Sequence, residues 1–483
     1  MNKPIRRVSV IALVLFLSLF ASSTWISFVQ APELNADSRN VRSLYREFGT
    51  NRGAIIVAGE EIASTEPIDD AFKYQRTYPQ GELYAPITGF YSVVYGRTGI
   101  ELAANEYLNG SSDSLAWARL ENLITGEDPQ GSAVELTINP VAQQAAWDAL
   151  GGQRGAAVAL DPTTGAILAM VSSPSFDPNT MATHSSADVR ASYNSLLEDP
   201  DKPLINRTIA GDTYPPGSVF KLVTAAAALE NGYTEDSAIE APVTYRLPGT
   251  QTDLPNFGGA SCTSGDTMPL ADALKISCNT SFAILGNELG QQKISDQAEA
   301  FGFGDSIRVP MTVTASRYPE NENDAQTALS AIGQQDVRVT PLQVAMVTSA
   351  IANGGELMTP YLIDQVRNPD LSVMSTTSPQ RYGTPISQST ADQLTRMMTS
   401  VVRDGTGKAA QISGVDVAGK TGTAETGGDS SAHAWFTAFA PADNPQVVVA
   451  VVVENGGSAG SEATGGAVAA PIARHIMEAV ISQ

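Results

Sequence analysis

The stretch that decides the fold spans residues 214–230 and runs YPPGSVFKLVTAAAALE. Two prolines and a glycine end any preceding element, and the alanine- and leucine-rich run from Lys221 favours a helix. Because residues three apart share a helix face, the Ser218 hydroxyl and the Lys221 amine are expected within hydrogen-bonding reach. A serine needs an adjacent base to become a nucleophile, and lysine provides one only where burial or nearby cations leave it neutral. The plain alternative is an N-cap serine with a surface lysine.

Two further short motifs follow along the chain. Ser277-Cys278-Asn279 comes after an apolar helical pattern and is expected in a loop or at a helix end, where it presents a hydroxyl and an amide. Lys420-Thr421-Gly422 is expected in a strand, with Gly422 allowing a substrate backbone to come close. Taken singly, these are also an ordinary turn and an edge strand with a solvated lysine. Their order, with Ser218 and Lys221 first, predicts a serine–lysine acyl-transfer site.

Apolar runs predict the sheet around these motifs. Residues 156–160 and 166–171 flank a Pro/Gly turn and predict a β-hairpin, and residues 434–439 and 447–453 predict two more strands. The runs lack polar alternation, which favours a sheet covered by helices on both faces. The Gly/Ser/Ala stretch 456–466 is expected to be a flexible loop, and residues 468–480 a closing helix with one apolar stripe. These elements predict one α/β domain whose sheet joins its two ends.

The N-terminus predicts a membrane anchor. Residues 1–7 carry Lys3, Arg6 and Arg7 and are expected in the cytoplasm; residues 8–29 are an apolar run long enough to span a bilayer. A cleaved signal peptide is the alternative, but its apolar core would be shorter. We expect a single-pass protein of the cell membrane whose remaining residues lie outside the cytoplasm. These form an N-terminal non-catalytic domain over 30–152 and a catalytic domain over 153–483.

Charge and residue composition limit the ligands that this chain is expected to bind. The chain has 483 residues and a formal net charge of -22, which argues against nucleic acid. Cys262 and Cys278 are the only cysteines, and outside the cytoplasm they are compatible with one disulfide, although two buried thiols are the alternative. The three histidines are scattered without ligand spacing, so no metal is expected. His433 is expected to be structural, and no cofactor is expected.

With these motifs, the chain resembles the class B, monofunctional penicillin-binding proteins. Tyr-Pro-Pro-Gly before Ser218, residues 332–335 and 340–343, and Ala434-Trp435-Phe436 resemble the transpeptidase part of that family; Arg52-Gly53 and residues 99–101 resemble its N-terminal region. The short N-terminal region is most like the actinobacterial penicillin-binding protein A group. One departure is Gln335, where the family often has glycine. The resemblance implies an α/β (α+β) fold: a transpeptidase domain of the penicillin-binding/β-lactamase-like type, with a central antiparallel sheet flanked by helices. A mixed α/β, pedestal- or dimerisation-like domain and one transmembrane helix would precede it.

The resemblance also implies residue roles. Ser218 would attack the penultimate D-alanine carbonyl of a peptidoglycan stem peptide and Lys221 would accept its proton. Ser277 would relay a proton to the leaving group beside Lys420, and Asn279 would hold the substrate amide. Thr421, Gly422 and Thr423 would bind the substrate, with the backbone N–H groups of Ser218 and Thr423 as the oxyanion hole. An amine of a neighbouring stem peptide would then resolve the acyl-enzyme, and β-lactam antibiotics would acylate the same serine.

The implied setting is cell-wall synthesis in cell division and cell shape, with a membrane glycan polymerase and other division proteins as partners. Residues 30–152 are too few for a glycosyltransferase domain by family analogy. A D,D-carboxypeptidase or β-lactamase-like hydrolase is the first alternative, although no glutamate between the second and third motifs has asparagine four residues later, as the class A pattern requires. A non-catalytic division scaffold is the second alternative.

Overall fold

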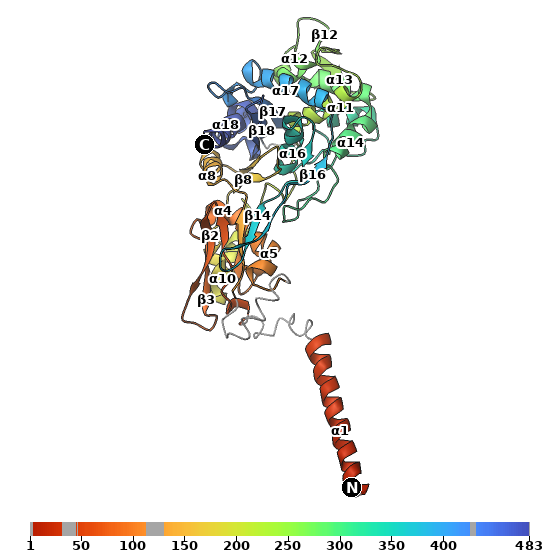
Figure 1. Cartoon of the computed structure of the whole chain (residues 1–483). Coiled ribbons are helices and arrows are strands. Elements are labelled where there is room, and N and C mark those ends of the chain that lie inside the picture. Colours follow the sequence, from red (N-terminus) through yellow and green to blue (C-terminus); the bar gives the residue numbers. More distant parts are fainter. Residues whose placement is uncertain (1–2, 31–44, 46, 113–129, 426–430, 483) are drawn as a thin grey trace.

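The computed structural model describes residues 3–30, 45, 47–112, 130–425 and 431–482, apart from the side chains of 461 and 462. Near the N-terminus, α1 (Lys3–Thr24) continues as a π-helix over Trp25–Val29. These 27 residues form the one helix in the described ranges that is long and apolar enough to cross a membrane, and none of them is buried in the protein. Figure 1 draws α1 in red, outside the two folded parts of the chain.

A six-stranded sheet forms the first folded part, in the order β15-β14-β6-β1-β2-β3. β1 and β6 pair in parallel and the other neighbours are antiparallel. The strands are β1 (Ile55–Val57), β2 (Glu60–Pro67), β3 (Tyr74–Thr77), β6 (Ala133–Leu136), β14 (Ile363–Arg367) and β15 (Val373–Thr376). β14 and β15 come from far along the chain, beyond the predicted boundary at 152/153, and complete this sheet.

Short elements surround this sheet. They are α4 (Gly81–Thr88), β4 (Tyr91–Ser92), β5 (Gly96–Arg97), α5 (Gly99–Ala103), α6 (Asn105–Leu108), α9 (Asn179–Ala182) and α10 (Ser186–Glu198). In Figure 1 α10 lies beside the first sheet, near β3, and Tyr193 on it stacks on Tyr95 with ring centroids 4.0 Å apart. Residues 174–198 therefore also pack against the N-terminal part.

Buried charges hold this part together. The Glu101 carboxylate, fully buried, accepts from Arg52 Nε at 2.6 Å and from Arg76 Nε at 2.7 Å, and the Tyr78 hydroxyl donates to it at 3.1 Å. The Arg52 guanidinium also lies 4.3 Å from the centre of the Tyr91 ring. Burial alone would raise the pKa of Glu101, but the two arginines outweigh it and hold the pKa below its usual value.

A five-stranded antiparallel sheet forms the second part, in the order β17-β18-β19-β7-β8. The strands are β7 (Gly155–Leu160), β8 (Ile167–Ser173), β17 (Ala418–Ala424), β18 (His433–Ala440) and β19 (Val447–Val453). The predicted hairpin and both predicted late strands are confirmed. β19, a run of six valines and one alanine, is buried along its whole length. It joins the two ends of the predicted domain, because it pairs with both β18 and β7.

Helices cover both faces of this sheet, as the apolar runs predicted. α8 (Pro140–Leu150) and α18 (Ala470–Ile481) pack on one face, and α16 (Pro341–Ala352) packs on the other, beside α17 (Gln388–Arg403). The stretch expected to be a flexible loop forms short 3-10 turns over Glu454–Glu462 and a π-helix over Gly465–Ala469 that leads into α18. Gly456, Gly457 and Gly460 in this stretch, and Asn455 just before it, adopt positive φ, which composition alone does not predict.

A group of helices completes the second part, on the α16 side of the sheet. They are α11 (Lys221–Glu230), α12 (Leu270–Lys275), α13 (Asn279–Leu289), α14 (Gln291–Ala300) and α15 (Asp324–Ala331). Three two-stranded sheets also occur: β9 (Ala238–Glu240) with β12 (Thr267–Pro269), β10 (Thr244–Arg246) with β11 (Asp253–Pro255), and β13 (Leu357–Met358) with β16 (Arg381–Gly383). Cys262 and Cys278 form a disulfide that links the loop before β12 to the start of α13.

Candidate active site

Ser218 lies in a tight turn in front of α11. The predicted helix begins at Lys221, and residues Gly217–Phe220 form one 3-10 turn before it. Gly217 has φ +53°, and its N–H donates to the Gly333 carbonyl at 2.9 Å. On the other side, Trp435 Nε1 donates to the Pro215 carbonyl at 3.1 Å. Tertiary bonds thus fix the turn and leave Ser218 partly exposed at its tip.

Lys221 is fully buried, and its contacts are specific. Its Nζ donates to the Ser277 carbonyl and to Asn279 Oδ1, both at 2.8 Å, and lies 3.4 Å from Ser277 Oγ. A neutral lysine amine has two N–H groups and one lone pair. The carbonyl and the amide oxygen accept both N–H groups, so the lone pair is left for a hydroxyl proton. The first motif is therefore joined to the second through its lysine.

Ser277 is held in an unusual backbone conformation. It lies in the short connection between α12 and α13 with φ +62°, a region that non-glycine residues rarely adopt. The N–H groups of Ser277 and Cys278 donate back to the last turn of α12, at Leu274 and Ala273. This connection presents the Ser277 carbonyl and hydroxyl to the lysines, and such strain is typical of functional sites.

Lys420 approaches Ser277 from the sheet. It lies on β17, is fully buried, and its Nζ donates to Ser277 Oγ and to the Thr421 carbonyl, both at 2.8 Å. The third motif is in a strand, as predicted. Ser277 Oγ is thus shared by the amines of Lys221 and Lys420, which makes it a route for a proton between them.

Burial sets the protonation of both lysines. Burial lowers the pKa of Lys420 to about 7. Burial, and then the charge of Lys420, hold the pKa of Lys221 well below its usual value. Among the described residues no carboxylate forms an ion pair with either amine. The lowered pKa favours the neutral form of Lys221 relative to an exposed lysine, and a neutral amine can act as a base.

Close backbone packing joins the turn of Ser218 to β17. A Cβ on Gly217 would lie 2.6 Å from the Thr423 carbonyl, and one on Gly422 would lie 3.0 Å from the Val219 side chain. Gly422 thus lets the nucleophile turn come close, whereas the sequence suggested a substrate backbone. The backbones of Ser218 and Thr423 are neighbours as a result.

The remaining predicted positions fall into two groups. Thr423 is half-exposed, whereas the Thr421 side chain is buried and its Oγ1 lies 2.7 Å from Thr406 Oγ1. Among the described residues, the Ser218 hydroxyl forms no hydrogen bond. The hydrogen bond to Lys221 that the sequence led us to expect is therefore not formed. The structure therefore joins the second and third motifs directly and leaves the nucleophile free to turn.

The sequence did not single out Asn256 and Thr406. Asn256 accepts the N–H groups of Asn279 and Thr280 at 3.0 Å each. Thr406 contacts the third motif from the loop after α17. Both act through tertiary contacts, and neither lies in a motif. The sequence contains one indication of Asn256, an asparagine in a Pro/Gly-rich loop, but an asparagine there is equally typical of an ordinary turn.

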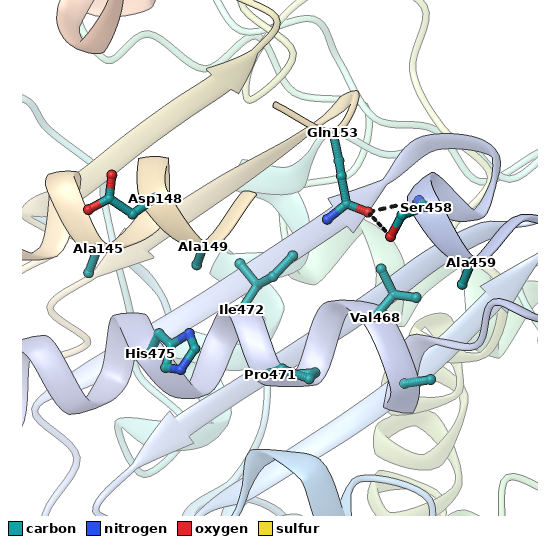
Figure 2. A pocket seen from close by; sticks show the side chains of 11 residues that line it. Ala145, Asp148, Ala149, Gln153, Ser458, Ala459, Val468, Pro471, Ile472 and His475 are labelled. Atoms are coloured by element: carbon teal, nitrogen blue, oxygen red, sulfur yellow. Dashed lines mark hydrogen bonds between the residues drawn. The ribbon is translucent and has the colours of Figure 1, made fainter. Parts of the chain in front are cut away.

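One hollow lies away from this site, and one histidine lies beside it. Figure 2 shows a hollow of about 660 Å³ between α8 and α18, where Gln153 Oε1 accepts from the Ser458 N–H at 3.0 Å; it contains none of the candidate residues. His433, the first residue of β18, pairs with Ala424, one residue beyond Thr423, and its Nδ1 accepts from the Asn455 N–H at 3.0 Å. In the ranges described, no three His, Cys, Asp or Glu side chains are grouped to hold a metal ion.

Comparison with known proteins agrees with this geometry. The profile described as "Penicillin binding protein transpeptidase domain" matches residues 155–478, and "Penicillin binding protein A dimerisation domain" matches residues 52–134. The chain is 44% identical to the peptidoglycan D,D-transpeptidase PbpA of Mycolicibacterium smegmatis, over 100% of both chains. It is also 44% identical to PbpA of Mycobacterium tuberculosis, over 100% of this chain and 99% of that one.

Solved structures give the same result. The ceftriaxone acyl-enzyme of penicillin-binding protein A from M. tuberculosis superposes with a TM-score of 0.88 at 43% identity, over 90% of this chain and 100% of that one. The penicillin G acyl-enzyme of the same protein gives 0.85 at 44% identity, over 89% and 100%.

Proposed function

Because this chain belongs to the family of penicillin-binding protein transpeptidases, we propose that it cross-links peptidoglycan stem peptides through an acyl-enzyme on Ser218. The convergence of two buried lysine amines on Ser277 Oγ, at 2.8 Å from Lys420 and 3.4 Å from Lys221, carries the proposal. A scaffold with a vestigial site has no reason to bury two lysines without carboxylate partners, since desolvation of an amine is unfavourable.

In the first half-reaction, Ser218 Oγ bonds to the penultimate D-alanine carbonyl carbon while its proton passes to Lys221. The carbonyl oxygen becomes an oxyanion, and the adjacent backbone N–H groups of Ser218 and Thr423 stabilise it. The C–N bond then breaks, and the departing D-alanine nitrogen takes a proton through Ser277. Asn279 and the Thr421–Thr423 segment hold the substrate.

In the second half-reaction, the amine of a neighbouring stem peptide attacks the ester carbonyl and gives up a proton, and Ser218 leaves with one. The cross-link and the free enzyme result. A β-lactam would acylate Ser218 in the same way, with its ring nitrogen as the tethered leaving group.

Intact mass spectrometry of the full chain in detergent, incubated with benzylpenicillin beside Ser218→Ala, tests this assignment. We expect an adduct of one benzylpenicillin on the wild type alone, lost slowly. An adduct that hydrolyses within seconds would favour a β-lactamase-like hydrolase, and the absence of any adduct would favour a scaffold.

The organisation of the chain supports a membrane-bound enzyme. We propose that residues 1–7 are cytoplasmic, that residues 8–29 span the membrane and that residues 30–152 and 153–483 lie outside as the non-catalytic and transpeptidase domains. Lys3, Arg6 and Arg7, in the first two turns of α1 and before its apolar run, support this orientation. Protease treatment of intact spheroplasts should digest the folded parts; their full protection would contradict the topology.

A glycan polymerase is the proposed partner in the membrane. The two matched regions, residues 52–134 and 155–478, are a dimerisation domain and a transpeptidase domain, and cross-linking needs glycan strands that a polymerase supplies. Co-purification of the full chain from crosslinked membranes should recover a glycan polymerase, and repeated recovery without one would contradict the proposal.

A further inference from the structure

The first turn of α13 receives its capping group from another part of the chain. Its N-cap position is Cys278, whose sulfur is in the disulfide and caps nothing within the helix. Asn256 supplies the missing acceptor: its Oδ1 takes the N–H groups of Asn279 and Thr280 at 3.0 Å each, and lies 3.2 Å from Thr280 Oγ1. The helix that carries Asn279 therefore begins where Asn256 holds it.

Asn256 is itself fixed in one orientation. Its side chain is in a buried residue, 5% exposed, and its Nδ2 donates to the Pro242 and Val243 carbonyls at 3.3 Å each. Both sides of the amide are thus matched, with two carbonyls on the nitrogen and N–H groups on the oxygen. A group held in this way can transmit its position to its partners.

Asn279, at the start of α13, contacts the proposed catalytic base. Asn279 Oδ1 accepts one N–H of Lys221 at 2.8 Å, and the Ser277 carbonyl, two residues earlier, accepts another. These two acceptors decide which way the lone pair of a neutral Lys221 amine points. A small displacement of the first turn of α13 would free one N–H and let the amine rotate.

We infer that Asn256 is a positioning residue for the acyl-transfer reaction, which acts through Asn279 to aim the Lys221 amine at the hydroxyl that it deprotonates. The inference rests on the proposed function of Ser218 and Lys221. Asn256 does not touch the reacting atoms in this arrangement; its effect passes through the backbone of α13.

The second-order rate constant for acylation of the detergent-solubilised full chain by benzylpenicillin, measured between pH 5.5 and 9.5, tests this role. Asn256→Ala is expected to acylate about 10- to 100-fold more slowly than wild type, because small misplacements of a catalytic group have effects of that size. The matched control is Gln143→Ala, which removes a fully buried amide with three backbone hydrogen bonds to Leu83 and Met170. It should lower the melting temperature and leave the acylation rate within about two-fold.

Asn256→Asp separates positioning from stability. It keeps an acceptor oxygen for α13, removes the donor to the Pro242 and Val243 carbonyls, and adds a negative charge near Lys221. The other described neighbours of Lys221 on facing elements are Lys420, Ser277, Asn279 and the Phe282 ring. Of these only Lys420 is ionisable. The added charge favours the ammonium form, so the acid limb of the acylation profile should move to higher pH, whereas the maximal rate should exceed that of Asn256→Ala.

Each outcome of these measurements supports or overturns the inference. Slow acylation by Asn256→Ala with a normal Gln143→Ala supports the inference, and wild-type rates in Asn256→Ala overturn it. If Asn256→Ala does not fold, the Asp variant decides: a displaced acid limb supports the role and an unchanged one overturns it. A wild type that forms no adduct would instead refute the proposed function, so the two failures are distinguishable.

Discussion

Replacing Glu101 with glutamine should destabilise the N-terminal part more than any surface change. The carboxylate is fully buried and serves two buried guanidinium groups, at 2.6 Å from Arg52 and 2.7 Å from Arg76. Removing one partner of a buried ion pair costs about 3–5 kcal/mol, because a buried charge is left uncompensated. Since two arginines lose their counter-charge here, we expect the upper half of that range, about 4–5 kcal/mol.

Urea unfolding of the fragment after Gln30, followed by far-UV circular dichroism, measures this change. With a urea dependence of about 2 kcal/mol per molar, a loss of 4 kcal/mol lowers the midpoint by about 2 M. Acylation of Ser218 by benzylpenicillin, assayed at each urea concentration, follows the catalytic part separately. The rate of acylation without urea should stay close to that of the wild type.

The control is Glu356→Gln, which breaks an exposed pair with Arg381 (side chains 51% and 60% exposed). Exposed pairs contribute about 0–1 kcal/mol, so its midpoint should hardly move. The pKa of Glu101 is lowered in the folded state, so its stabilisation is present above the unfolded pKa and lost as pH falls through the folded one. The difference between wild type and Glu101→Gln should therefore shrink in acid. A midpoint shift below about 0.5 M at neutral pH would refute the reasoning.

Three further predictions concern the catalytic part. Lys221→Ala should acylate about 100- to 10,000-fold more slowly while keeping its melting temperature within a few degrees, as stopped-flow with a chromogenic cephalosporin would show; near-normal rates would remove Lys221 as the base. Lys420→Ala removes the charge that lowers the pKa of Lys221, so any residual acylation should have its acid limb at higher pH in the same assay, and an unmoved limb would contradict the coupling. Reduction of the Cys262–Cys278 disulfide should destabilise by about 3 kcal/mol in the chain-entropy model, seen as a lower melting temperature with dithiothreitol; identical melting curves, with loss of the bond verified by alkylation, would argue against it.

Local patterns predicted much of the fold. The valine run 447–453 and the hairpin 155–173 are strands because their residues are apolar and bounded by turns, which a single sequence displays directly. The three motifs were found for the same reason: each is contiguous, and the structure brings Lys221, Ser277 and Lys420 together.

The features that could not be predicted from the sequence depend on contacts between separate elements of the chain. The pairing of β14 with β6 joins residues more than two hundred positions apart, and no local pattern indicates it. Asn256 reaches α13 from a loop that resembles any turn, and Thr406 meets Thr421 across two elements. Gln335, noted as a departure from the family pattern, has φ +58°, a backbone conformation that favours the glycine often found there in the family.

The position of β19 in its sheet has a consequence for how the enzyme is made. During synthesis β7 and β8 emerge early, but the edge of β7 stays unpaired until β19 follows, because Val448 lies opposite Leu160. Until then the nascent chain exposes an apolar strand edge, which invites aggregation, and its long-range pairing makes folding slow. A polypeptide truncated just before Val447 would contain all three motifs but would lack β19, the strand that joins β18 to β7 and completes the sheet. Such a product should not react with penicillin, so antibiotic binding would report completed synthesis of the domain.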